Sequence, residues 1–590
     1  MAHLALGVLL VVSTMSAGEE PKATAWVARS NELAKPLLDV LARFNPEAAS
    51  QFGVESVDEQ VIDLKPDFQK RFRAAVIEAR DEIHGQLASE KDPAVRQDIE
   101  ILVKAANDQV RGSEISEKYH IDYFNISRLV FASMHSLLDD QVPPERRLKA
   151  MTRLRRYAGL EPGYEPIIAL AEARTRESEK PGRTGPAKAE LEKDLSNSAF
   201  FMEGIGQLFE KYKIPGYQEA YEKLKQQMAG YDEFLRKEVL PKARADFRLP
   251  AEEYEYQLQT VGVDATPEQL VTMAHAAFSD VQAQMQKLAP KVAKQHGIPA
   301  TDYRDVIRAL KKDQLVGDAI LPHYKARLKE IEEIIRREKL VTLPQRPARI
   351  RLASAAETAA VPAPHLDPPR LIGNTGEQAA FVLPLNIPSQ DGNAAKTKYD
   401  DFTFNAASWT LTAHEARPGH ELQFDSMMER GVSTARAVFA FNSTNVEGWG
   451  LYAEYILEPF MPADGQLISL QHRLMRTARM FLDPELQMGK VTPEQAKATL
   501  MNDVVLSDAM AQQEVERYTF AAPGQATSYY YGYSKLLDLR RDVEKQLGAK
   551  FNARRFHDFL LAQGLLPPDL LRKAVMEDFV RQEQGTGAAK

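Results

Sequence analysis

The sequence has 590 residues and a mass of 66.2 kDa, and its 44% hydrophobic and 27% charged residues predict a folded globular protein rather than a disordered chain. A formal net charge of -8 provides no general basic surface for a nucleic-acid backbone, so we expect no nucleic-acid partner. The sequence contains no cysteine, which excludes disulfides, thiolate metal ligands, catalytic thiols and lipid attachment through an N-terminal cysteine. Any metal is therefore expected to bind nitrogen and oxygen ligands.

The first 18 residues resemble a secretory signal peptide. The apolar run from Leu4 to Met15 is too short to span a hydrocarbon core of ~30 Å, and the small residues 16–18 follow it. We predict that residues 1–18 are a signal peptide and that the protein is exported to the periplasm or secreted, without stable membrane insertion. Because only the amino group and His3 supply positive charge before the run, an unprocessed N-terminus on a cytoplasmic protein is the alternative.

Residues 19–345 carry apolar residues at helical spacing. From Ala25 to Phe44 they recur every three and four positions, and Asn45-Pro46 then ends the pattern. Thr266-Pro267-Glu268-Gln269 is typical of a helix start, because Thr266 can act as the N-cap and Gln269 can complete a capping box. The same four residue types recur at 492–495. The pattern predicts a mainly α protein.

The composition changes over residues 346–400. Prolines are frequent between Pro344 and Pro369, and the run from Phe381 to Ile387 has the composition of a short strand. We predict loop and a small sheet here, followed by a second helical region over residues 401–590.

The sharpest motif is His414-Glu415-Ala416-Arg417-Pro418-Gly419-His420. Zinc peptidases commonly place two histidines four residues apart on one helix face, with a glutamate beside the first. Six residues rotate an unbroken helix by about 240°, so the two rings would point to different sides. Pro418 cannot continue the hydrogen-bond ladder and Gly419 tolerates unusual backbone angles. We expect a two-residue bulge there that returns His420 to the face of His414.

Two glutamates follow at a distance that suits a returning helix. Glu447 lies 27 residues beyond His420, and Glu454 is seven residues further, so the two share a helix face. One can bind a metal while the other accepts a hydrogen bond from a ligand histidine. The alternative is two solvated glutamates, but their neighbours Trp449, Leu451 and Tyr452 are a poor setting for unpaired charge.

These motifs resemble the bacterial domain-of-unknown-function 885 family, whose members are similar to helical zinc peptidases such as carboxypeptidase Taq, thimet oligopeptidase and angiotensin-converting enzyme. The resemblance covers roughly residues 25–580 and is most specific at the histidine motif. The segments that carry it are 346–350, 376–377 with Phe381, 400–402, 414–423, 447–454, 517–518, 523–526 with 528–529, and 539–540.

The resemblance implies a large helical, zincin-like body with a deep active-site cleft, the metal on its floor and a small β element beside it. Residues 19–345 would then form the cleft walls, and 401–590 would carry the site. It further implies one zinc ion per chain, with His414, His420 and Glu447 as the ligands. Glu415 would be the general base. Tyr529 would face the substrate, although the consecutive Tyr530 and Tyr531 leave this register open.

The chemistry of these residue types is consistent with peptide hydrolysis. Three protein ligands leave a fourth position on zinc for water, whose pKa then falls to about 7. Glu415 can take the proton of that water and pass it to the leaving amine, while a tyrosine donates to the developing oxyanion. The sequence therefore predicts a zinc-dependent metallopeptidase with peptides as its substrates.

Two other functions use the same residues. Two histidines and one carboxylate also form the facial triad of non-haem iron oxygenases, although those sites usually lack a glutamate beside the first histidine. A non-catalytic, exported peptide-binding protein on a peptidase scaffold is the second alternative, and retention of the three ligands with Glu415 argues against it. The site of cleavage along a peptide and the oligomeric state stay open. Glu447 is preferred over Glu454 as the ligand by resemblance.

Three arginines at helical spacing, Arg473, Arg476 and Arg479, precede Asp483. They can anchor a substrate carboxylate, but a solvated or salt-bridged helix face is the preferred interpretation. The other histidines, among them His135, His365 and His472, form no paired motif and are interpreted as ordinary surface or core residues.

Overall fold

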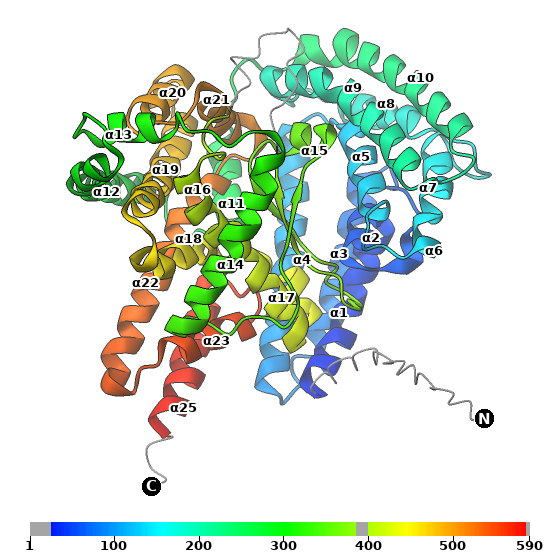
Figure 1. Cartoon of the computed structure of the whole chain (residues 1–590). Helices are drawn as coiled ribbons and strands as arrows, with labels where there is room; N and C mark the ends of the chain where they lie inside the picture. Colours follow the sequence, from blue (N-terminus) through cyan, green and yellow to red (C-terminus); the bar gives the residue numbers. More distant parts are fainter. Residues whose placement is uncertain (1–24, 385–398, 586–590) are drawn as a thin grey trace, which may run out of the picture.

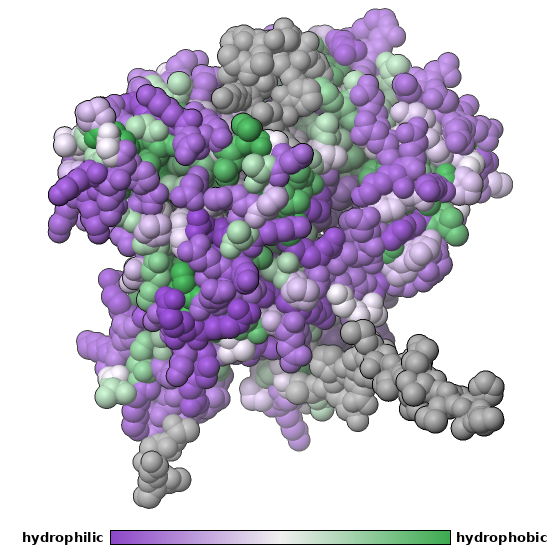
Figure 2. Space-filling model, viewed as in Figure 1, coloured by the Kyte–Doolittle hydropathy of each residue, from purple (hydrophilic) through white to green (hydrophobic). Residues whose placement is uncertain are grey.

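The computed structural model describes residues 25–384 and 399–585, and helices dominate these ranges, so the prediction of a mainly α protein is confirmed (Figure 1). The predicted signal peptide, residues 1–18, lies outside the described residues. On the face shown in Figure 2, hydrophilic residues cover most of the surface and hydrophobic residues form small scattered groups.

The N-terminal helices α1–α10 occupy the centre and right of Figure 1 and carry two apolar cores of their own. Their bounds are α1 Ala25–Phe44, α2 Pro46–Phe52, α3 Phe68–Gly85, α4 Pro93–Tyr119, α5 Ile126–Leu137, α6 Pro144–Arg147, α7 Lys149–Tyr157, α8 Ile167–Ser178, α9 Lys188–Lys211 and α10 Gln218–Phe234.

The later helices lie mainly at the left of Figure 1. In the largest core of the described residues α12 packs along α19, and in a separate core α18 packs along α22. Their bounds are α11 Ala251–Thr260, α12 Pro267–His296, α13 Tyr303–Leu310, α14 Ile320–Glu338, α16 Asn405–Leu411, α17 His420–Arg430, α18 Ser443–Leu457, α19 Ala463–Gln487, α20 Pro493–Asn502, α21 Asp508–Glu516, α22 Ser528–Leu547, α23 Ala553–Ala562, α24 Pro568–Ala574 and α25 Val580–Gly585.

Local sequence signals place several helix ends correctly. The first helix covers Ala25–Phe44 as predicted, and the side chain of Asn45 then caps the next helix. Thr266 and Thr492 are the N-caps of α12 and α20, and each forms the predicted capping box. These signals succeed because a cap satisfies backbone N–H groups within its own four residues.

Three short strands form the sheet, in the order β1-β3-β2: β1 Arg349–Leu352, β2 His365–Asp367 and β3 Ala380–Leu383, with the short helix α15 Ala355–Ala360 between the first two. The central strand β3 runs parallel to β1 and antiparallel to β2, and all its residues are buried. It covers the first part of the predicted strand Phe381 to Ile387, and residues 385–387 lie outside the described ranges.

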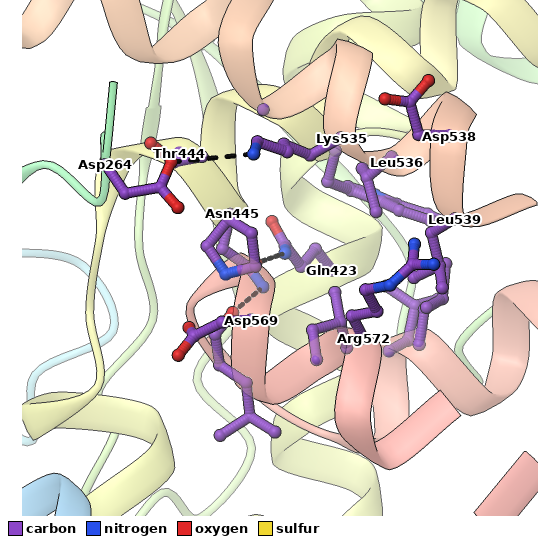
Figure 3. A pocket seen from close by; sticks show the side chains of 17 residues that line it. Asp264, Gln423, Thr444, Asn445, Lys535, Leu536, Asp538, Leu539, Asp569 and Arg572 are labelled. Atoms are coloured by element: carbon purple, nitrogen blue, oxygen red, sulfur yellow. Dashed lines mark hydrogen bonds and ion pairs between the residues drawn. The ribbon is translucent and has the colours of Figure 1, made fainter. Parts of the chain in front are cut away.

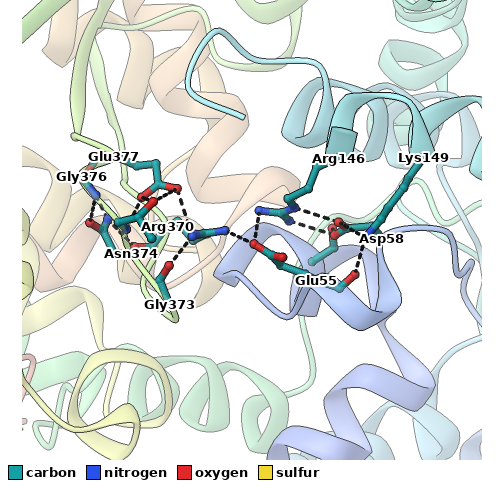
Figure 4. Close-up of polar contacts among 11 residues, drawn as sticks. Glu55, Asp58, Arg146, Lys149, Arg370, Gly373, Asn374, Gly376 and Glu377 are labelled. Carbon is teal, nitrogen blue, oxygen red and sulfur yellow. Dashed lines mark hydrogen bonds and ion pairs between the residues drawn. The ribbon is translucent and has the colours of Figure 1, made fainter. Parts of the chain in front are cut away.

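A polar network fixes the connection between β2 and β3 to the N-terminal helices (Figure 4). Arg370 donates to Glu55 at 2.5 Å and pairs with Glu377 at 3.2 Å. Arg146 contacts Glu55 at 3.5 Å and forms a bidentate pair with the buried Asp58 at 2.8 and 2.9 Å. Because bidentate arginine–carboxylate pairs fix geometry as well as charge, the network holds the connection between β2 and β3 against the N-terminal helices.

A search of the described residues for helices that could cross a bilayer finds none of sufficient length and apolar character.

Candidate metal centre

The backbone between the two motif histidines is not one bulged helix. A wide π-type turn, η5 Thr412–Ala416, ends the helix, Arg417 is extended, and α17 begins afresh at His420. Gly419 is required because a Cβ there would lie 1.8 Å from the carbonyl oxygen of His414. The expected two-residue bulge is thus replaced by a break between two helices, because the peptides at Pro418 and Gly419 leave the helical ladder altogether.

The break brings the two imidazoles together with a carboxylate. The ring centroids of His414 and His420 are 4.6 Å apart, at an angle of 80°. Nε2 of each ring lies 3.3 Å from the same oxygen, Oε2 of Glu447. The ligand atoms of the three residues all lie within 4.8 Å of one another, and the search of residues 25–384 and 399–585 finds no other such group of three.

The donor set fits a zinc ion. Zinc bonds of about 2.0–2.2 Å in a tetrahedral arrangement separate neighbouring ligand atoms by about 3.3 Å, which matches the two contacts to Glu447. Burial opposes the negative charge of Glu447, but hydrogen bonds and charge interactions with the two imidazoles lower its pKa well below the usual range. Burial disfavours the charged form of His414, but hydrogen bonds to Glu447 and Glu454 outweigh it and raise its pKa to about 9. The cluster therefore attracts a positive charge.

Glu454 orients the first histidine. Its Oε1 lies 2.7 Å from Nδ1 of His414, and its Oε2 accepts a hydrogen bond from Thr410 at 2.6 Å. Burial opposes the charged form of Glu454, yet Arg476 and His414 lower its pKa to about 2. An imidazole that donates from Nδ1 to a carboxylate presents Nε2 as a metal ligand. Of the two glutamates on α18, Glu447 points its carboxylate at both histidines and Glu454 supports one of them from behind.

Two glycines of α18 allow close packing, one against this ring and one against α22. A Cβ at Gly450 would lie 2.5 Å from Cε1 of His414, and a Cβ at Gly448 would lie 2.6 Å from the backbone of Gly532. The two glycines therefore allow α18 to approach the imidazole on one side and α22 on the other. Trp449 donates from Nε1 to the carbonyls of Pro418, at 3.0 Å, and Gly419, at 3.2 Å, and so holds the break between the histidines.

Glu415 lies beside the cluster without belonging to it. Its side chain is buried, and among the described residues no group is hydrogen-bonded to its carboxylate. Burial raises the pKa of Glu415, while His414, His420 and, from β2, His365 act in the opposite direction. The carboxylate is thus a buried, weakly solvated proton acceptor next to the convergent ligand atoms.

The three consecutive tyrosines face different surroundings. The ring of Tyr529 lies parallel to that of His414, with centroids 6.4 Å apart, and its hydroxyl accepts a hydrogen bond from Arg517 at 3.1 Å. Tyr530 packs against other aromatic side chains, and the hydroxyl of Tyr531 donates to Asp264. Tyr529 is therefore the residue of the three that adjoins the cluster.

The arginine series on α19 is buried rather than solvated. Arg473 pairs with Glu458, and Arg479 forms a bidentate pair with Glu514 at 2.6 and 2.7 Å. Arg476 lies 3.6 Å from Glu454, and its Nε has no partner among the described residues. Periodicity placed these residues on one helix, but whether that face meets water depends on the elements packed over it.

His365 is a neighbour of the site that sequence reasoning missed. It lies on β2, which packs against η5, and it lines a cavity of about 280 Å³ between α5, α15 and the sheet. No motif surrounds it, because its position comes from strand pairing rather than from sequence spacing.

Comparison with known proteins places the chain in a family without assigning an activity. The family model described as "Bacterial protein of unknown function (DUF885)" matches residues 46–575. No curated protein matches the sequence. Two solved structures share the fold: a "putative lipoprotein" from Colwellia psychrerythraea, with a TM-score of 0.72, and a "putative lipoprotein of unknown function" from Shewanella oneidensis, with 0.67. Each is 19% identical, and each match covers 94% of this chain and 100% of the other.

Proposed function

This chain belongs to the DUF885 family of bacterial proteins, and we propose that it is a zinc-dependent peptidase with one zinc ion per chain. The observation that carries the proposal is the convergence of His414 Nε2, His420 Nε2 and Glu447 Oε2, with the carboxylate of Glu415 adjacent but outside the ligand set. These residues are the ones that would hold the metal.

A bound zinc ion would supply an acidified water and a Lewis acid for the scissile carbonyl. Glu415 takes the proton of the attacking water and delivers it to the leaving amine. The hydroxyl of Tyr529, which accepts a hydrogen bond from Arg517, donates to the oxygen on which negative charge develops. Glu454 keeps the ring of His414 in one orientation, so the residue acts on geometry rather than on substrate.

The position of Glu415 favours hydrolysis over the two alternatives. An iron enzyme with the same three ligands has no need of a carboxylate beside the first histidine. A protein that only binds peptides has no need of a carboxylate held beside the ligand atoms, where burial raises its pKa.

A cavity lined by His365, the histidine of β2 that acts on Glu415, suits peptides. The cavity at His365 lies between the N-terminal helices and the sheet and is lined by both cationic and anionic side chains. Extended peptides carry backbone donors, acceptors and terminal charges that such a surface can bind. The fold neighbours are described as lipoproteins. Together with the apolar segment at residues 4–15, this favours an exported enzyme acting on peptides outside the cytoplasm.

The test is the elemental metal content of protein purified without chelator, compared with His420→Ala. We expect about one zinc per chain in the unaltered protein and none in the variant, together with cleavage of a peptide library that chelator abolishes and added zinc restores. His135→Ala is the matched control, because His135 also contacts a glutamate, at 2.8 Å, but is half-buried and lies outside the cluster. Metal-free protein that added zinc cannot load would refute the proposal. Tightly bound iron without peptide cleavage would favour the oxygenase.

A further inference from the structure

A second cavity lies on the opposite side of α18 from the metal cluster. It has a volume of about 380 Å³ and is bounded by α17, α18, α22, α23 and α24 (Figure 3). Asn445 and Trp449 line it, whereas Glu447 and Glu454 project from the other face of the same helix toward the histidines. The cavity is thus separate from the proposed active site, and its size falls in the range of small-molecule sites.

The walls of this cavity are mostly apolar. One side is the indole of Trp449. Leucines from α22, α23, α24 and the connection between the last two helices form much of the rest, namely Leu536, Leu539, Leu560, Leu561, Leu566 and Leu571. Several of these side chains are almost fully buried in the protein and so form a fixed surface. Such walls favour an apolar occupant, because its transfer from water is favourable by about 25 cal/mol per Å² buried.

One buried polar atom has no partner. Gln423 is 4% exposed and lines the cavity, and its Oε1 has no hydrogen-bond donor among the described residues. The orientation of this amide is fixed by its neighbours. Asn445 must donate from Nδ2 to the carbonyl of Leu566, at 2.7 Å, so its Oδ1 accepts from Nε2 of Gln423, at 2.9 Å (Figure 3). The free atom is therefore an acceptor, and it requires a donor.

Charged side chains at the opening of the cavity restrict the charge that the headgroup of a ligand can carry. Asp264, Asp538 and Asp569 line the cavity together with Lys535 and Arg572, which is three carboxylates and two cations. Three ion pairs form there, Lys535 with Asp264, Arg572 with Asp542 and Arg541 with Asp538, and they leave the negative charge of Asp569 unbalanced among the lining residues. An anionic headgroup would meet net negative charge, so fatty acids and organic phosphates are disfavoured.

We propose that this cavity binds a neutral, mostly apolar small molecule that carries a single hydrogen-bond donor, and that the donor bonds to Oε1 of Gln423. The apolar body lies against Trp449 and the leucines. Because Trp449 also holds the carbonyls of Pro418 and Gly419, the bound molecule contacts the residue that fixes the break between the two histidines. Binding itself does not depend on chemistry at the metal centre.

A matched pair of probes tests the donor. N-phenyl-1-naphthylamine is neutral, apolar and fluorescent, and it has one N–H donor, while 1-benzylnaphthalene replaces that N–H by a methylene group. We expect saturable binding of the amine at one site per chain and competition by the hydrocarbon at about fivefold to tenfold lower affinity, the worth of one net hydrogen bond. Equal affinities for the two compounds, or no saturable binding, would overturn the proposal.

Variants locate the site. Leu571→Phe narrows the cavity and should weaken amine binding at least tenfold, whereas the same substitution at Leu148, which is 55% exposed, should leave it unchanged. Gln423→Met removes the acceptor and should abolish the difference between the two probes. The efficiency of energy transfer from tryptophan to the bound amine should fall most in Trp449→Phe and should be unchanged in Trp26→Phe. Binding unaffected by Leu571→Phe, or transfer that survives in Trp449→Phe, would place the probe elsewhere and refute the assignment.

Discussion

A half-buried cluster around Glu357 and the more deeply buried cluster around Glu447 both combine histidine with carboxylates, and they differ in what neutralises the carboxylate. In one, Glu357 contacts His135 at 2.8 Å and Arg351 at 2.7 Å, and Arg351 also pairs with Asp367 at 3.0 Å. In the other, the ion pairs of Glu447 among the described residues are with His414 and His420 alone. In the first cluster, arginine and histidine side chains neutralise the carboxylates and bond to them. In the second, three ligand atoms converge, and no arginine or lysine among the described residues forms an ion pair with Glu447.

The comparison shows that histidine and carboxylate side chains lying close together do not by themselves make a metal site. A guanidinium at a carboxylate occupies the position a metal would take, and its donors satisfy the lone pairs. Where only imidazoles converge on the carboxylate, both the charge and the lone pairs remain available to a divalent ion. The cluster around Glu357 should therefore stabilise the fold, and the cluster around Glu447 should bind metal.

The largest expected effect separates Glu415, which lies beside the metal cluster, from Glu357 of the other cluster. Glu415→Gln should lower kcat for peptide hydrolysis by about 10²–10⁴-fold, because the water loses its proton acceptor, while the metal content stays unchanged. Glu357→Gln should also retain metal but lower the free energy of unfolding, because Arg351 and His135 lose a charged partner. Steady-state kinetics with metal analysis measures both variants. Full activity in Glu415→Gln would exclude it as the general base.

A second comparison uses neighbouring tyrosines. Tyr529→Phe should reduce kcat by about 10²–10³-fold with little change in KM, because the lost hydroxyl acts on charge that develops in the transition state. Tyr530→Phe removes the same atom one residue away, where the side chain packs on other aromatics, and should change kcat little. Equal losses in the two variants would show that Tyr529 has no special role.

Two glycines test whether the metal cluster depends on the close approach of α18 to His414. Gly450→Ala places a Cβ 2.5 Å from the ring of His414, so the zinc content should fall and unfolding should become easier by roughly 1–3 kcal/mol. Gly230→Ala in α10 meets open space and should stabilise the protein by roughly 0.5–1 kcal/mol, because alanine favours the helix. Chemical denaturation with metal analysis tests the pair. Full zinc content in Gly450→Ala would mean that the helix can shift without disturbing the site.

The smallest effect concerns the pH dependence of the arginine-containing cluster. Burial opposes ionisation of Glu357, but His135 and Arg351 lower its pKa below the ordinary 4.5, so its contribution to stability is present above that pH and is lost as pH falls. Burial likewise opposes charge on His135, but Glu357 raises its pKa above the ordinary 6.5, so that contribution is lost as pH rises through the raised value.

The pair should therefore contribute most near pH 6, where both partners are charged. The unfolding free energies of the unaltered protein and His135→Gln should differ by about 1–2 kcal/mol there, and the difference should shrink at lower and higher pH. Denaturant titrations across the pH range provide the measurement. A constant difference would show that packing, and not charge, accounts for the contribution of His135.

Much of the helical framework could be predicted from local sequence. The caps at Thr266 and Thr492 and the helix Ala25–Phe44 depend on interactions within a few residues, so the chain specifies them without knowledge of its neighbours. The histidine motif likewise selected the residues that meet in the cluster. Its geometry was harder to predict, because a proline and a glycine announce an irregularity without stating whether the helix bulges or ends.

Residues far apart in sequence decided the rest. The approach of α22 to α18 placed Tyr529, rather than Tyr530 or Tyr531, beside His414. Helix phase and packing together turned Glu447 toward both histidines and Glu454 toward the back of one. The burial of Arg476 and the position of His365 follow from packing around α19 and from strand pairing. None of these side-chain positions can be inferred from a short stretch of sequence alone.

The sequence by itself determined that the chain is mainly helical, where several helices begin and end, and which side chains are able to bind a metal through nitrogen and oxygen. Only the tertiary structure decided which carboxylates meet an arginine and which meet imidazoles alone. The physical reason is range: capping and periodicity act within a turn of helix, whereas the charge balance of a buried carboxylate depends on every element packed around it.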